Sequence, residues 1–271
     1  MPETREDSSS TRTPELFDGL SDSVRQSILS ASVPRVFSSR EKIFLEGEPK
    51  QKLFLLVKGV VKVSQVNSKG DEVILCLNVP GQVIGSLRDM VGSTLTSSAL
   101  ALQSSKVAMW SWPTFQAIMD RLPLVHRNVQ QMMVHQITEL SSRICEISTA
   151  PVEFCLARAL IRLTDQIGRR VDGHFEVSLT QQVLSQIVGT GAFHVNHLLS
   201  DWERQGLVTR RRCLLVVRDL AGLKRLCEGT RRGAHRRVES ALVSSTSQAE
   251  SQRTEQSDWT RNPTVTSRTV D

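Results

Sequence analysis

The sequence lacks the patterns that mark disulfide-rich, secreted and membrane-spanning proteins. Its five cysteines are odd in number, scattered and without a CxxC pair, which argues against a disulfide framework or a zinc site. There is no amino-terminal apolar run with a basic flank, so we expect no signal peptide. The longest apolar stretches fall far short of a membrane span. We therefore expect a soluble, cytoplasmic protein in a reducing environment, with no membrane partner.

Catalytic signatures are also missing. No paired acids, nucleophile–base pair or glycine-rich phosphate loop stands in a convincing sequence context, and Gly189-Thr190-Gly191 is too short for a P-loop. We expect that the chain is not an enzyme.

What the chain does have is a modest excess of positive charge. Lys and Arg number 34 against 28 Asp and Glu, for a formal net charge of +6. This permits a polyanionic partner without demanding one. The positive residues crowd the last third of the chain: Arg204, Arg210, Arg211, Arg212, Arg218, Lys224, Arg225, Arg231, Arg232, Arg236 and Arg237.

The hydrophobic pattern divides the chain into segments and predicts an α+β fold. Residues 1–13 and 230–271 are polar with few large apolar side chains, and both are expected to be disordered, the second as a basic tail. Residues 14–121 contain short runs rich in Val, Ile, Leu and Phe between turn residues, which predicts an antiparallel β-barrel or jelly roll. Residues 122–150 predict one long helix, and residues 151–229 a smaller helical domain with short strands.

The long helix carries an apolar stripe at steps of three and four. One interpretation is that the stripe packs on the barrel of the same chain. The other, which we favour because the stripe is longer than a small barrel can cover, is a dimer seam. The residues assigned to this seam are Val125, Val129, Met132, Leu140, Ile144 and Ile147.

A helix-turn-helix pattern lies between residues 180 and 208. Gly189 can adopt the left-handed turn, and Ser185, four positions earlier, lets the two helices approach. Apolar residues close the corner, and two short β runs around Arg210, Arg211 and Arg212 follow as a wing. The alternative is a helical hairpin within an ordinary core, but the wing favours a winged helix-turn-helix.

This order of elements resembles the CRP/FNR family of bacterial transcription regulators over about residues 16–227. The most family-like stretches are "VKGVVKV", "NSKGDEVIL", "PGQVIGSL" and "LSQIVGTG". The resemblance implies a sensor barrel of the cyclic-nucleotide-binding type, a dimerisation helix and a winged helix-turn-helix domain. It also implies three partners: double-stranded DNA, a second copy of the chain and RNA polymerase.

The ligand pocket departs from the family pattern. Cyclic-nucleotide binders of the family carry a Gly-Glu pair that binds the ribose and, further on, an Arg-Ser or Arg-Thr pair that binds the phosphate. Here the first pair reads Gly85-Ser86, and no arginine stands near Thr96 and Ser97. Arg88 is the nearest cation, and it either turns inward or stays in solvent. We expect no gating by cyclic AMP in the usual way; the barrel binds another effector or none.

A haem or redox centre is not expected either. Family members with iron–sulfur clusters place cysteines near the amino terminus, and this chain has none before Cys76. His126 and His135 are nine residues apart on the long helix and point in different directions. Cys76 lies in an apolar run, where a cysteine usually serves packing. We therefore expect no resident metal or cofactor.

The second helix of the helix-turn-helix, called the recognition helix below, begins near Ala192 and is the second place where the chain departs from the family pattern. Where many family members have an Arg-Glu pair and a later Arg, this chain has Ala192, Phe193 and His197. Ala192 and Phe193 can pack on a thymine methyl, although Phe193 can also turn back into its own domain. His194, Asn196 and His197 offer hydrogen bonds to bases or phosphates. The other expected DNA contacts are Thr180, Gln181, Gln182, Thr190, Arg210, Arg211 and Arg212.

Two functions remain open from the sequence. The first is a homodimeric, sequence-specific transcription regulator whose target differs from the usual family site. The alternative is a sensor or scaffold module that keeps the fold and has lost sequence-specific reading of DNA; the missing recognition arginine favours it, and the wing arginines argue against it.

Overall fold

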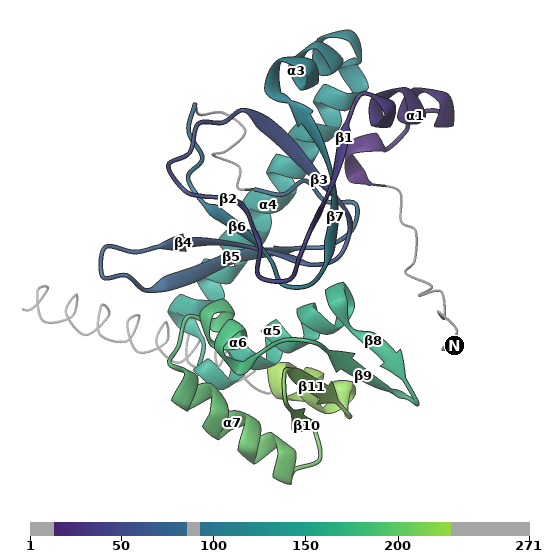
Figure 1. Cartoon of the computed structure of the whole chain (residues 1–271). Coiled ribbons are helices and arrows are strands. Elements are labelled where there is room, and N and C mark those ends of the chain that lie inside the picture. Colours follow the sequence, from purple (N-terminus) through teal and green to yellow (C-terminus); the bar gives the residue numbers. More distant parts are fainter. Residues whose placement is uncertain (1–13, 86–92, 229–271) are drawn as a thin grey trace, which may run out of the picture.

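The computed structural model describes residues 14–85 and 93–228. The expected disordered segments 1–13 and 230–271, together with Ser86 and Arg88, lie outside these ranges. In Figure 1 a β-rich domain lies above a smaller domain of helices and short strands, and one long helix connects the two.

The β-rich domain contains two antiparallel sheets. One has the order β1-β7-β3, from strands Val33–Phe37, Ser105–Ser111 and Lys52–Lys58. The other has the order β2-β6-β4-β5, from Lys42–Phe44, Ser98–Ala101, Val61–Val66 and Glu72–Asn78. Their inner faces enclose an apolar core that includes Phe37, Phe54, Leu56, Val61, Val63 and Val107. The antiparallel barrel expected from the short strand runs is confirmed.

Strand β4 is buried on both faces along most of its length. Val61 and Val63 point into the barrel core, as their alternation indicates, but Lys62 and Ser64 between them are buried too. They are covered because the second face of the β4–β5 hairpin meets the smaller domain, where α6 packs on β5 (Figure 1).

Helices cover the other side of the first sheet. The short turn η1 (Glu15–Phe17) and helix α1 (Asp22–Ser30) precede the strands, and Ser21 caps α1 by accepting a hydrogen bond from the Val24 amide. Helix α3 (Trp112–Arg121) follows β7. Asn128, on the next helix, fixes η1 through hydrogen bonds from Nδ2 to the carbonyls of Leu16 and Asp18.

Helix α4 (Pro123–Thr149) is the long connection, about 40 Å at 1.5 Å per residue. It ends before Pro151, because the residue before a proline disfavours helical geometry, and Ala150 is extended with ψ 153°. Helix α5 (Val152–Ile167) then enters the smaller domain. The predicted boundaries of both helices are confirmed to within a residue or two.

The smaller domain combines helices α6 and α7, and a helix at residues 220–228, with a four-stranded sheet. Helices α6 (Gln181–Val188) and α7 (Ala192–Arg204) pack against α5 around Leu156, Leu160 and Leu199. The sheet has the order β10-β11-β9-β8, from Val208–Arg211, Leu214–Val217, His174–Val177 and Arg169–Val171. The hairpin of β8 and β9 was missed by the sequence interpretation. Its signal is Asp172-Gly173, a dipeptide typical of tight hairpins, and both residues have positive φ.

Candidate nucleic-acid interface and effector cleft

The turn between α6 and α7 has the geometry that the sequence predicts. Gly189 is left-handed, with φ 73° and ψ 34°, and closes α6 by donating its amide to the Ser185 carbonyl. Ser185 is buried at the corner, where a larger side chain would hold the helices apart. Thr180 begins α6 by accepting from the Val183 amide. These contacts confirm the helix-turn-helix.

The corner is stabilised by a shared apolar core. Leu184 and Val188 of α6 meet Val195 and Leu199 of α7, and all four are buried. Trp202 is fully buried as well, and its Nε1 lies 3.3 Å from Glu153 of α5. The sequence interpretation missed Trp202, although it continues the series from Val195 and Leu199 at helical spacing.

The opposite face of α7 remains exposed. Ala192, Phe193, His194, Asn196 and His197 all lie in solvent. Phe193 is 86% exposed, so it does not turn back into its own domain. A large aromatic side chain this exposed is unusual on a surface, and here it stands at the beginning of the recognition helix.

The wing lies beside α7 (Figure 1). Strands β10 and β11 pair from Val208 with Val217 to Arg211 with Leu214. The tight turn is completed by Cys213, which has φ 56°. Arg211 and Arg212 are exposed at the tip, as phosphate contacts would require. Thr180, Gln181 and Gln182 are exposed at the start of α6, and Thr190 is half-buried.

Arg210 differs from the other two wing arginines, because it is already paired with groups of its own domain. Its Nε lies 2.9 Å from Glu203 Oε2, and its backbone amide donates to Glu203 Oε1 at 2.8 Å. Its NH1 also donates to Asn196 Oδ1 at 2.6 Å. The two hydrogen bonds that Glu203 accepts from Arg210 hold the pKa of Glu203 below its ordinary value. Arg210 therefore binds the recognition helix to the wing, and sequence spacing gave no signal of this pairing.

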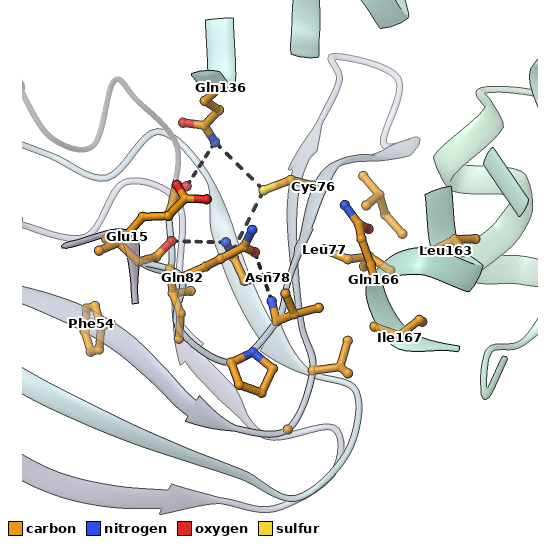
Figure 2. Close-up of a pocket in the computed structure, with 18 of the residues that line it drawn as sticks. Glu15, Phe54, Cys76, Leu77, Asn78, Gln82, Gln136, Leu163, Gln166 and Ile167 are labelled. Carbon is orange, nitrogen blue, oxygen red and sulfur yellow. Dashed lines mark hydrogen bonds between the residues drawn. The ribbon is translucent and has the colours of Figure 1, made fainter. Parts of the chain in front are cut away.

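A large cleft lies between the barrel, α4 and α5. Its volume is about 1710 Å³, and Cys76, Asn78 and Gly85 line it from the barrel side. Figure 2 shows Gln136 above Cys76, with Gln166 and Ile167 facing them from α5. Gln136 Nε2 lies 3.4 Å from the Gly85 carbonyl.

The predicted ligand-pocket residues that the structure describes do not all line this cleft. Gly85 lines the cleft. In the part of the chain that the structure describes, Thr96 and Ser97 are not among the residues that line this cleft. Both residues lie just before strand β6. Ser97 is fully buried, and the Thr96 carbonyl accepts a hydrogen bond from Gln65 at 2.5 Å.

Polar contacts join the barrel to the helix-turn-helix. Glu72 of β5 accepts hydrogen bonds from Lys62 at 2.7 Å, Ser64 at 2.6 Å and Gln186 of α6 at 2.9 Å. Burial raises the pKa of Glu72, but the hydrogen bonds and the charge of Lys62 together outweigh burial and hold the pKa below its ordinary value. Glu72 is therefore an anionic link between strand β5 and helix α6.

Arg143 of α4 makes a second link at the same place. Its guanidinium donates to the carbonyls of Leu75 and Ile74 in β5, and to the Ile187 carbonyl at the end of α6 at 3.1 Å. Burial, followed by the nearby charge of Arg162, lowers the pKa of Arg143. A cation at a helix carboxyl terminus is favourable, so one side chain connects all three elements.

Two family models match this chain, one over each domain. The cyclic nucleotide-binding domain model matches residues 34–122, and the Crp-like helix-turn-helix domain model matches residues 156–226; together they cover more than half of the chain. The chain belongs to the CRP/FNR family. It is a transcription regulator with a helix-turn-helix DNA-binding domain, and the proteins it resembles are regulators, not enzymes.

Relatives of this CRP/FNR regulator match it over most of their length. The CRP-like cAMP-activated global transcriptional regulator of Mycobacterium tuberculosis is 24% identical over 218 residues, which are 78% of this chain and 95% of the relative. Two solved structures share the fold at a TM-score of 0.64. FixK2 from Bradyrhizobium japonicum is 19% identical over 72% of this chain and 96% of its own. The c-di-GMP responsive global regulator CLP of Xanthomonas campestris is 16% identical over 73% and 99%.

Helix α4 of this CRP/FNR regulator has two apolar faces, which corrects the predicted seam. Val125 and Val129 are buried in the core of their own domain, and Met132 packs against the same core. Leu140 is half-buried, whereas Ile144 and Ile147 are exposed.

The exposed apolar face of α4 also contains Val134 and Ile137, which the sequence interpretation missed. Val134, Ile137, Ile144 and Ile147 are between 51% and 64% exposed. Val134, Ile137, Ser141 and Ile144 follow each other at steps of three, four and three, the spacing of a coiled-coil seam.

In residues 14–85 and 93–228, no helix is both long and apolar enough to cross a membrane.

Proposed function

We propose that this regulator is a homodimer that reads a specific DNA sequence through α7 and is not gated by cyclic AMP in the usual way. The observation that carries the proposal is the surface formed by α7 and the wing. An exposed helix face with Phe193, Asn196 and His197 stands beside the exposed Arg211 and Arg212. The helix supplies groups that can contact base edges, and the arginines supply phosphate contacts.

The dimer is proposed from the exposed face of α4. Val134, Ile137, Ile144 and Ile147 leave an apolar stripe in water along the second half of a helix about 40 Å long. Pairing two such stripes about a two-fold axis would bury them and would present two α7 helices. The DNA site then consists of two half-sites about one helical turn apart.

The altered pocket supports an effector other than cyclic AMP. Relatives of similar fold differ in this respect, since one is named as cAMP-activated and another as c-di-GMP responsive. Ser86 replaces the family's ribose-binding Glu, and no arginine stands near Thr96 and Ser97. Losing one charged partner of a buried anion costs about 2–5 kcal/mol, so calorimetry should detect no cyclic AMP binding in the micromolar range. Binding there would overturn this part of the proposal. No resident metal, haem or redox centre is part of the proposal.

The family resemblance adds RNA polymerase as a partner and the cytoplasm, where bacterial DNA lies, as the site of action. Neither is needed for DNA recognition itself, so a test with purified protein and DNA is sufficient for the central proposal.

The proposal is tested by capturing random-sequence duplexes on the purified chain and sequencing the bound fraction. We expect one enriched, two-fold symmetric motif for the native chain. Ala192→Glu places a carboxylate on the exposed face of α7 and should abolish enrichment. The matched control Gln205→Glu adds the same charge just beyond the end of α7 and should keep the motif. Enrichment of no motif by the native chain would favour the scaffold alternative.

A further inference from the structure

Asn196 occupies the centre of the exposed face of α7. It lies one turn after Ala192 and Phe193 and beside His197, and all four are in solvent. If α7 enters the major groove, Asn196 faces base edges. This inference rests on the proposed DNA-reading function.

The Asn196 side chain is held by the wing. Its Oδ1 accepts from Arg210 NH1 at 2.6 Å, and the same NH1 lies 3.5 Å from the Asn196 carbonyl. Arg210 is fixed in turn by Glu203, which accepts from both Nε and the backbone amide of Arg210. Asn196 is therefore held at one end of a chain of charged hydrogen bonds within the domain.

A guanidinium has donors and no acceptor, so it decides which way the amide turns. The oxygen must face Arg210, because the reverse orientation would place the amide N–H groups against the cationic N–H groups. Because Asn196 is exposed, its amide nitrogen is then the group left to donate to a partner outside the domain. A charge-assisted hydrogen bond is roughly twice as strong as a neutral one, which keeps the orientation fixed.

We propose that Arg210 is a positioning residue that fixes Asn196 as a hydrogen-bond donor toward the DNA, so that the contacted base must offer an acceptor. In the major groove guanine offers N7 and O6, adenine offers N7, and thymine offers O4. Cytosine offers its N4 amino group, a donor, which the Asn196 amide nitrogen repels. The half-site therefore contains one position, set by Asn196, that prefers a base with a major-groove acceptor (guanine, adenine or thymine) and rejects cytosine.

Arg210 exerts this effect without contacting DNA. Its charge is compensated by Glu203, and its side chain is 27% exposed. Arg211, the next residue on the same strand, is exposed at the tip of the wing. Replacing Arg210 should change base preference without changing the salt dependence, whereas replacing Arg211 should do the reverse.

The experiment measures binding of the full chain to the selected duplex and to duplexes with each base at each half-site position, over a salt series. The native chain should disfavour cytosine at one position by about tenfold, the scale of one good base contact. Arg210→Gln frees the amide to turn over and should largely remove this discrimination. The matched control Arg211→Gln should keep it and lower the salt slope by about one.

A second variant leaves Arg210 in place and does not depend on the wing tolerating its loss. In Asn196→Asp the outward atom becomes an acceptor, so the same position should now accept cytosine, whose N4 group donates, and reject guanine and thymine, which offer only acceptors there. The inference is overturned if Asn196→Asp and Arg210→Gln weaken all duplexes equally, or if the salt slope falls in Arg210→Gln as it does in Arg211→Gln. A native chain that prefers no duplex would overturn the proposed function and this inference together.

Discussion

The replacement Ile144→Asp should separate the proposed dimer into monomers. An Ile side chain gains about 1.5–3 kcal/mol on full burial, and Ile144 is 64% exposed in the single chain. About two thirds of that gain remains available, so covering Ile144 contributes about 1–2 kcal/mol per copy and about 2–4 kcal/mol for the two copies. At 1.4 kcal/mol for each factor of ten, the dimer dissociation constant rises by roughly 30- to 700-fold. Two carboxylates facing each other across the axis add to this loss.

Sedimentation over a concentration series, with DNA binding measured in parallel, tests this prediction. The matched control is Val36→Asp on β1, because Val36 is 63% exposed and the change is the same; it should leave the dimer intact. Val129→Asp should instead lower the melting temperature, since it buries a charge in the domain core. If Ile144→Asp and Val36→Asp both dimerise as the native chain does, or if the native chain is monomeric at micromolar concentration, the α4 seam is wrong.

Three further predictions concern the wing, the recognition helix and the domain contact. Arg212→Gln should weaken binding to all duplexes alike and lower the salt slope by about one, as measured by anisotropy titrations. His197→Ala should weaken the selected site by about 1–3 kcal/mol more than a scrambled duplex, because a base contact is lost; equal losses would assign His197 to phosphate. The pKa of Glu72 is lowered in the folded chain, so its contribution to stability is present above the ordinary value of 4.5 and is lost as the pH falls through the folded pKa. Melting curves of Glu72→Gln should therefore show a smaller acid loss than the native chain, and an identical pH profile would contradict the lowered pKa of Glu72.

The helix-turn-helix could be predicted from sequence because its constraints are local. Gly189 must be left-handed and Ser185 must be small for reasons that depend on neighbouring residues along the chain. The boundaries of α4 and α5 follow from Pro151 in the same way. Such signals are readable without knowing what the helices pack against.

The exposed face of α4 and the pairing of Arg210 could not be predicted because they depend on distant parts of the chain. A period of 3.6 reveals that α4 is apolar along one side, but not which residues its own barrel covers. Val129 is buried in the core between the first sheet and its covering helices, and Val134, five residues later, is exposed. From the sequence, Arg210 is one of three adjacent wing arginines. Its partners Glu203 and Asn196 are 7 and 14 residues away, and only the fold brings them beside it.

The ratio of two affinities tests sequence-specific reading by α7 most directly. The purified chain is titrated against the duplex enriched in selection and against a scrambled duplex of the same composition, at physiological salt. Specific sites are typically bound at least 10³-fold more tightly than non-specific DNA, and we predict a ratio of about that size or more, which Ala192→Glu reduces to near one. A ratio near one for the native chain would contradict sequence-specific reading, with the exposed face of α7 then serving another purpose.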